Sequence, residues 1–192
     1  MEGRGVHLPR RLLRRGRHDE GARRRRADLD PADDLLGTTA QAIADGRIVG
    51  WYQGRGECGP RALGNRSILA DPRRADSKDR LNEKVKHRES FRPFAPSCLA
   101  ERAGEYFASG YPSPVMLLVF DVLEHQRDRV PSITHADGTA RVQTVSKTDN
   151  PLYHELISRF DQLTGVPMLV NTSFNDNEEP IVCSRRTPCA AS

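Results

Sequence analysis

Glycine and arginine gather in one short segment whose composition suits the binding of an anion. Residues 54–67 read GRGECGPRALGNRS. Glycines let a backbone approach a ligand closely, and the backbone N–H groups can then face a negative charge. Arg61 and Arg66 add planar guanidinium groups whose donors match the oxygens of a phosphate. The segment therefore predicts an anion-binding loop, although a Gly-rich stretch with arginine is also typical of an ordinary turn.

A second segment, KHRESFRPF at residues 86–94, holds three cations within seven residues. These are Lys86, Arg88 and Arg92, and two phenylalanines alternate with them. A run of charge is most often a solvated surface. Here the alternating aromatic residues, and a proline that holds the preceding backbone extended, favour a partly buried segment.

Two further segments place polar side chains beside predicted strands. Arg141 ends DGTAR at residues 137–141 and opens a strand, where the alternative is a surface arginine on an edge strand. Asn171 and Ser173 belong to NTSFN at residues 171–175, which follows the apolar strand PMLV. Small amides and hydroxyls at the end of a strand are well placed to bind a ligand in an open α/β sheet, and they also form ordinary turns.

The net charge of the chain is +4, but residues 2–26 alone carry ten arginines against three acidic residues, or +7. The rest of the chain is therefore about −3, and seven of its twenty cations lie in three of the four segments. This separation predicts a small anionic ligand, with phosphates as the obvious class. No Walker loop, Rossmann fingerprint, nucleophile elbow or metal-ligand spacing occurs, and nucleic-acid binding is disfavoured because no aromatic residues interleave the arginines.

Hydrophobic periodicity places these segments between alternating strands and helices, which predicts an α/β domain. The most apolar stretch, residues 115–122, is predicted to be a central strand. The other predicted strands cover residues 47–52, 67–70, 94–99, 141–146 and 166–170. The predicted helices run from Asp30-Pro31 to Gly46, over 76–87 with Asp76 as the cap, over 101–107, and over 151–163 with Gly165 at the end.

Four cysteines stand at positions 58, 98, 183 and 189, without a Cys-x-x-Cys pair. This spacing predicts free thiols in a cytoplasmic protein. No apolar run approaches the roughly 18 residues that a membrane span needs, and the charged N-terminal segment lacks the apolar core of a secretory signal.

Several long strings resemble the C-terminal domain of the O-carbamoyltransferase family. They are GRGECGPRALGNRSILADPR, KHRESFRPFAPS, DGTARVQTV and TGVPMLVNTSFN followed by EEPIV, in the family's order. The family includes enzymes of antibiotic biosynthesis and of nodulation-factor decoration. The resemblance covers about residues 31–184 and implies a YrdC-like fold, an open twisted mixed sheet with flanking helices.

The resemblance also implies an activity. In the family, this domain uses ATP, with Mg²⁺, and carbamoyl phosphate: released carbamate attacks the α-phosphate of ATP to give carbamoyl-adenylate and pyrophosphate. A Kae1-like domain, which carries an iron site and the acceptor pocket, then transfers the carbamoyl group to a hydroxyl. We expect this chain to lack that domain, and therefore not to complete carbamoyl transfer alone.

Carried over position by position, the resemblance implies ligand contacts for most of the residues singled out above. Lys86 and Arg92 are the predicted catalytic residues. The predicted substrate- and nucleotide-binding residues are Arg61, Arg66, Arg88, Arg141, Asn171 and Ser173. No metal ligand is predicted within the domain. Cys58 replaces a usual aromatic residue and Glu178 a frequent glycine, for which we expect local repacking only.

The predicted domain spans residues 29–184, between an Arg-rich tail at 1–28 and an aberrant segment at 185–192. A single-base deletion after Ser184 would turn a typical family ending into the observed one, so the last residues are interpreted as a frameshift product. Three alternatives stay open: a threonylcarbamoyl-adenylate synthase of tRNA modification, a nucleic-acid binder that uses the tail, and an inactive fragment.

Overall fold

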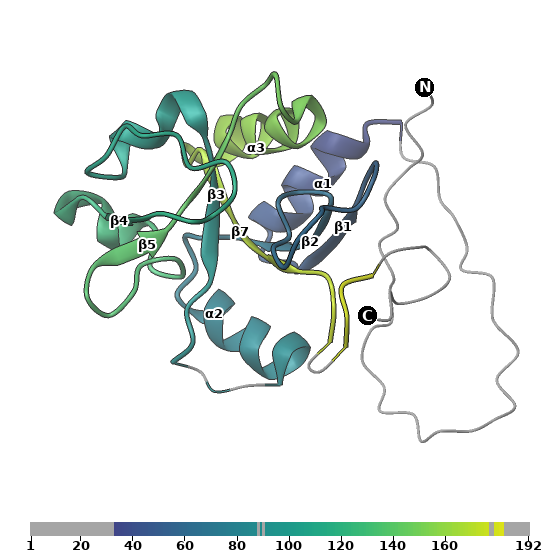
Figure 1. Ribbon diagram of the computed structural model, residues 1–192, viewed down its shortest axis with the longest axis horizontal. Coiled ribbons are helices and arrows are strands. Elements are labelled where there is room, and N and C mark those ends of the chain that lie inside the picture. The colour runs from purple at the N-terminus through teal and green to yellow at the C-terminus, as the bar shows by residue number, and fades with distance from the viewer. Residues whose placement is uncertain (1–32, 88, 90, 177–178, 183–192) are drawn as a thin grey trace, which may run out of the picture.

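The structure, a computed structural model, describes residues 33–87, 89, 91–176 and 179–182 (Figure 1). Several of the predictions fall outside this range. They concern the tail at 1–28, Asp30, Pro31, Arg88, Glu178, Cys183, Cys189 and the segment 185–192.

A five-stranded sheet forms the centre of the domain, in the order β1-β2-β7-β3-β6. Its strands are β1 (Val49–Tyr52), β2 (Arg66–Ala70), β7 (Met168–Ser173), β3 (Ala95–Leu99) and β6 (Gln143–Val145). The pair β3–β6 is parallel and the other pairs are antiparallel. The predicted α/β class with a mixed sheet and flanking helices is therefore confirmed.

Strand β7 lies in the middle of this sheet and carries the predicted NTSFN residues. Asn171 pairs with Leu69 on β2 and with Ala95 on β3. The prediction that Asn171 and Ser173 follow the strand is wrong, because β7 continues through Ser173. Asn171 is paired on both sides and Ser173 with β2 alone, so both polar residues lie within the sheet.

Two helices, α1 (Leu35–Ala44) and α3 (Pro151–Thr164), pack beside each other against the sheet (Figure 1). Asp34 caps α1 by accepting a hydrogen bond from the Gly37 N–H, and Asn150 caps α3 in the same manner. The predicted end of α3 is confirmed, since Gly165 adopts the left-handed conformation with φ 70°. The sheet and helices bury Trp51 and Phe160 completely, and burial of such a side chain contributes on the order of 1.5–3 kcal/mol.

The predicted helix over residues 76–87 is present in two parts. Helix α2 (Asp76–Leu81) continues into η1 (Asn82–Lys86), a π-helical turn. The predicted capping role of Asp76 is wrong: the preceding residue, Ala75, is already helical, and the Asp76 carboxylate instead pairs with the Arg74 guanidinium at 3.0 Å. The π-turn changes the direction in which the end of the helix presents its side chains, and the last of them is Lys86.

The predicted central strand over residues 115–122 is wrong. Only β4 (Val119–Asp121) is extended, and it pairs with β5 (Thr139–Arg141) in a separate two-stranded sheet. The predicted strand 141–146 is likewise divided between two sheets, with the buried Val142 separating β5 from β6.

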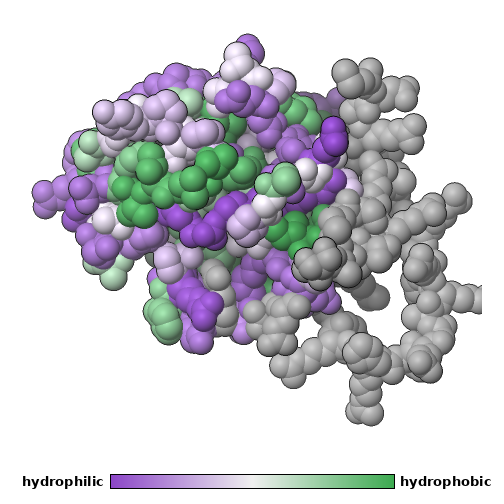
Figure 2. Space-filling view, in the orientation of Figure 1, coloured by the Kyte–Doolittle hydropathy of each residue, from purple (hydrophilic) through white to green (hydrophobic). Residues whose placement is uncertain are grey.

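The apolar side chains of this segment face outward, which explains why its hydrophobicity misled the prediction. Val115, Leu117, Leu118 and Val119 are exposed, whereas Met116 between them is buried. Figure 2 shows a hydrophobic patch on this face of the molecule, near β4 in Figure 1.

Two short 3₁₀ helices, η2 (Ala100–Glu105) and η3 (Glu124–Arg129), complete the described elements. Cys58 is exposed and Cys98 is buried, and both are free thiols as predicted. Within the described ranges, none of the helices is both long and apolar enough to cross a membrane.

Candidate anion-binding site

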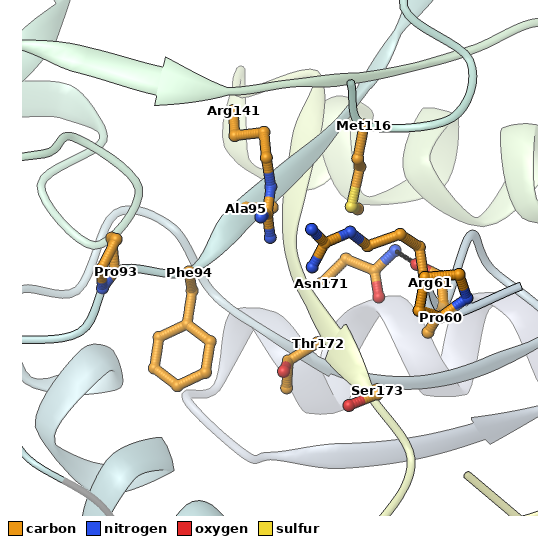
Figure 3. Close-up of a pocket in the computed structure, with 11 residues that line it drawn as sticks. Pro60, Arg61, Pro93, Phe94, Ala95, Met116, Arg141, Asn171, Thr172 and Ser173 are labelled. Carbon is orange, nitrogen blue, oxygen red and sulfur yellow. Dashed lines mark hydrogen bonds between the residues drawn. The ribbon is translucent and has the colours of Figure 1, made fainter. Parts of the chain in front are cut away.

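A cavity of about 130 Å³ lies where the glycine-rich loop meets the central strand β7. Four of the predicted site residues line it: Arg61, Arg141, Asn171 and Ser173. Figure 3 shows the guanidinium groups of Arg61 and Arg141 entering the same space from different segments. The remaining lining residues are Pro60, Ala62, Pro93, Phe94, Ala95, Met116 and Thr172. The lining thus contains two cations and no carboxylate, which suits a small anion.

The Arg61 guanidinium is available to a ligand. The residue is exposed, and within the described part of the chain its side chain has no hydrogen bond or ion pair. Arg141 is half-buried at the end of β5 and reaches the cavity from the opposite wall in Figure 3. Two converging guanidinium groups can share the oxygens of one phosphate through charge-assisted hydrogen bonds.

The loop that carries Arg61 is held by a carboxylate that the sequence reasoning did not single out. Glu57 Oε1 accepts hydrogen bonds from the backbone N–H groups of Leu63 and Asn65, each at 2.7 Å, and from that of Arg66 at 3.3 Å. One side chain thus closes the loop on itself. The position of a glutamate within a glycine-rich segment could have drawn attention to Glu57. Its hydrogen-bond partners are backbone N–H groups, which no residue pattern reveals.

Arg66 also holds this loop in place. Its guanidinium donates to the carbonyl oxygens of Gln53, Asn65 and Gly54 at 2.6–3.1 Å, and it stacks on the Tyr52 ring at 3.5 Å. The side chain is buried and is not part of the cavity lining. The structure therefore gives Arg66 a supporting role, whereas the sequence predicted contact with a ligand.

Gly64 packs directly against Tyr153 of helix α3. Its φ is 107°, and a Cβ atom there would lie 2.2 Å from Cδ1 of the buried Tyr153. Gly56, in the same loop, has open space around the corresponding position. The loop therefore needs glycine at 64 for both backbone and packing reasons.

We expect Gly64→Ala to lower the free energy of unfolding by roughly 2–5 kcal/mol, the combined cost of overpacking and of a left-handed alanine. Gly56→Ala is the matched control and should change it by less than about 1 kcal/mol. Urea unfolding of both variants, followed by circular dichroism, measures the difference. Equal stabilities would contradict the packing argument.

Lys86 is buried, with 6% of its surface exposed, and its ammonium group is surrounded by oxygens. Its Nζ donates to Ser173 O at 2.7 Å, Ser173 Oγ at 3.2 Å, Asn175 O at 2.9 Å and Asn175 Oδ1 at 2.7 Å. Lys86 thus fixes the carboxyl end of β7 directly beside the cavity. Of the two described cations of its segment, Lys86 and Arg92, Lys86 is the one that lies at the site.

Asn175 is a further site residue that the sequence reasoning passed over, although it lies within the NTSFN string. Its Oδ1 accepts from Ser173 Oγ at 2.6 Å as well as from Lys86, and its Nδ2 donates to Glu179 O at 2.6 Å. The signal was present in the sequence as a second amide two residues after a serine.

Arg92 lies apart from these residues. Its guanidinium pairs with the Glu89 carboxylate at 3.0 Å, both side chains are more than half exposed, and neither lines the cavity. The structure does not bring Arg92 together with Lys86, and Arg88 is not among the described residues.

The cavity offers no activated nucleophile. Burial raises the pKa of the Cys98 thiol and of the Tyr153 hydroxyl far above neutrality, so both stay protonated. Burial lowers the pKa of His135, which lies outside the lining. The described residues contain no group of three potential metal ligands. Such a site can bind and orient anions and stabilise their charge, which is the electrostatic form of catalysis.

Comparison with solved structures supports the fold. Full-length HypF in its phosphate- and nucleotide-bound form superimposes with a TM-score of 0.52 at 19% identity, over 80% of this chain and 19% of that chain. E. coli YciO gives a TM-score of 0.50 at 12% identity, over 75% of this chain and 65% of that chain. These neighbours agree with the predicted YrdC-like fold.

Comparison with known sequences gives closer relatives. Nodulation protein NolNO of Sinorhizobium fredii is 54% identical over 160 residues, which cover 82% of this chain and 24% of that protein. The 3'-hydroxymethylcephem-O-carbamoyltransferase of Amycolatopsis lactamdurans is 48% identical over 150 residues, covering 78% and 28%. The chain thus spans about a quarter of the length of these relatives. The carbamoyltransferase C-terminus family matches residues 40–191, and the chain belongs to that family.

Proposed function

We propose that this domain makes carbamoyl-adenylate from ATP and carbamoyl phosphate, as one half of an O-carbamoyltransferase. The observation that carries the proposal is the small cavity in which two guanidinium groups converge above a buried amide. Its volume of about 130 Å³ suits a compact anion, whereas a drug-sized ligand needs roughly 300 Å³ or more. The nucleotide would therefore lie mostly outside it.

The proposed reaction proceeds in two balanced steps. Carbamoyl phosphate reacts with water to give carbamate and inorganic phosphate. A carbamate oxygen then attacks the α-phosphorus of ATP. The bond between the α-phosphorus and the oxygen that bridges to the β-phosphate breaks, and pyrophosphate leaves. Carbamoyl phosphate, carbamate and ATP are all anionic, so the first demand on the protein is to neutralise charge and bring these reactants together.

In this proposal, residues around the cavity neutralise the charge of the reactants and position them. Arg61 and Arg141 would hold the phosphate of carbamoyl phosphate, and charge-assisted hydrogen bonds of this kind contribute roughly 1.5–3 kcal/mol each. Lys86 acts through Ser173 and Asn175, because its ammonium group fixes both beside the cavity. The donor set contains cations and amides and therefore does not fit a protein-held metal. We propose that Mg²⁺ arrives with the nucleotide.

The acceptor chemistry would belong to another domain. By its name, the Amycolatopsis relative carbamoylates a hydroxymethyl group, and three quarters of its length lies outside the match to this chain. We propose that a Kae1-like domain, with the family's iron site, receives the adenylate. The exposed apolar side chains around β4 are the first surface to examine for contact with it.

Release of pyrophosphate by the full chain tests the proposal. We expect release from ATP to require carbamoyl phosphate, with carbamoyl-adenylate detected by mass spectrometry. Lys86→Met should lower the rate at least tenfold, since it removes the charge that fixes Ser173. Lys84→Met is the matched control, because Lys84 is exposed in the same π-turn.

Two outcomes would contradict the proposal. Release that needs threonine and bicarbonate, and ignores carbamoyl phosphate, would identify a threonylcarbamoyl-adenylate synthase. No release in any arm, from protein with the circular dichroism of a folded domain, would show that the chain is inactive by itself.

A further inference from the structure

Asn171 presents an unsatisfied acceptor at the cavity. It is 2% exposed in the middle strand of the sheet, and it lines the cavity. Within the described part of the chain, its Oδ1 atom has no hydrogen-bond donor. Buried polar atoms are nearly always paired, so an exception beside a ligand cavity calls for a partner from the ligand.

The orientation of this amide is fixed by its neighbours. Asn171 Nδ2 donates to the Ala62 carbonyl oxygen at 3.0 Å, and a carbonyl can only accept. The same Nδ2 lies 2.9 Å from Ser97 Oγ. Rotation of the amide by 180° would set Oδ1 against the carbonyl oxygen and lose this hydrogen bond.

A second carbonyl fixes the other end of the network. Gln143 Nε2 donates to Leu63 O at 2.8 Å, so Gln143 Oε1 is the acceptor for the Ser97 hydroxyl at 2.6 Å. The Ser97 oxygen is then left to accept from Asn171. Ser97 and Gln143 are both buried, and together with two carbonyls of the glycine-rich loop they hold Oδ1 outward from the network.

The ligand group that satisfies such an atom must be a donor. A cavity built from cations selects anions but does not distinguish one acyl phosphate from another. Carbamoyl phosphate differs from acetyl phosphate by an NH₂ group in place of a methyl group, and NH₂ is a donor. Arg61 and Asn171 line the same cavity, so a phosphate group held by Arg61 would bring the attached acyl group close to Asn171.

We propose that Asn171 Oδ1 accepts a hydrogen bond from the carbamoyl NH₂ and is the residue that selects carbamoyl phosphate over other acyl phosphates. This assignment rests on the proposed function and adds the atom that reads the acyl group. An acceptor held by a rigid network discriminates strongly between ligands with and without a donor group, because a ligand that lacks the donor leaves the acceptor buried and unpaired.

Two stable analogues isolate this contact. Phosphonoacetamide carries the NH₂ group, and acetonylphosphonate carries a methyl group in its place. Calorimetric titration of the full chain should give at least a tenfold tighter Kd for phosphonoacetamide. In Asn171→Leu the two Kd values should become equal, while the Kd of inorganic phosphate stays within about twofold of the wild-type value, which shows that the cationic part of the cavity is intact.

A milder variant keeps the test decisive if leucine disturbs the sheet. Ser97→Ala leaves Asn171 in place but removes one of its acceptors, and the preference for phosphonoacetamide should fall without a change in phosphate binding. Preference that survives in both variants, or that is absent from the wild type while all three anions bind, overturns the assignment alone. A wild-type chain that binds none of the three anions overturns the proposed function as well.

The adenine amino group is the other donor that could reach Oδ1. Wild type and Asn171→Leu are therefore also compared for binding of ATP and of inosine triphosphate, which lacks that amine. We expect the variant to leave the ratio of these two Kd values unchanged. A ratio that collapses in Asn171→Leu would assign the atom to adenine and overturn the proposal.

Discussion

Replacing Arg141 with alanine is expected to lower kcat/KM for carbamoyl phosphate by roughly 10- to 150-fold, the loss of one charge-assisted contact worth about 1.5–3 kcal/mol. Arg141 extends from the end of β5 into the cavity, opposite Arg61. The loss should be larger than that of a surface cation because the site gathers its charge in a cavity of about 130 Å³. Rates of pyrophosphate release at several carbamoyl phosphate concentrations measure it.

Arg74→Ala is the control for this experiment. Arg74 is an exposed arginine that pairs with Asp76 and is not part of the cavity lining. Its removal should change kcat/KM by less than about twofold, as is usual for surface substitutions. Arg141→Lys adds a second comparison: it keeps the charge but loses the planar fork, so an intermediate rate indicates bidentate recognition. An Arg141→Ala rate equal to that of Arg74→Ala would remove Arg141 from the site.

Local signals explain which parts of the fold were predictable. Helix α3 has an apolar stripe, an asparagine cap with proline after it and a glycine at its end, and all of them act within a few residues of each other. Strands β2 and β3 are short segments that the sheet buries at every position. The segment 115–122 is more apolar than either, but burial depends on which surface covers a residue, and no local pattern contains that information.

The site was predictable in its residue types and unpredictable in its geometry. Sequence reasoning named Arg61, Arg141, Asn171 and Ser173, and the structure places all four around one cavity. It could not separate the cations that line the cavity from those that hold the protein together. Arg61 and Arg66 lie five positions apart in one loop, yet of the two only Arg66 donates hydrogen bonds to backbone carbonyl oxygens.

The geometry of the site was unpredictable because it depends on contacts between segments that are distant in the sequence. Asn171 and Gln143 are brought together because β7 and β6 both flank β3. Lys86, the last residue of η1, donates a hydrogen bond to Ser173 on β7, 87 positions further along the chain. Each arrangement depends on pairing between residues far apart in the chain, and the identity of a single amide or amine does not encode its partner.

Glu57→Ala should destabilise the loop strongly and weaken its anion binding as well. It removes the acceptor of three backbone N–H groups, and an unsatisfied buried group costs about 1–3 kcal/mol. The loop is partly exposed, so water replaces some of these contacts, and we expect a loss of roughly 2–4 kcal/mol in the free energy of unfolding. Because the same loop presents Arg61, phosphate binding should weaken in parallel.

Urea unfolding together with calorimetric phosphate titration measures both effects. Glu83→Ala is the control, because Glu83 is exposed on η1 and should leave both quantities unchanged. Glu57→Gln retains an oxygen acceptor and should recover part of the stability, which separates the hydrogen bonds from the charge. If Glu57→Ala unfolds within about 0.5 kcal/mol of the wild type, the carboxylate does not organise the loop, and the placement of Arg61 must depend on Arg66 and on the packing of Gly64 against Tyr153.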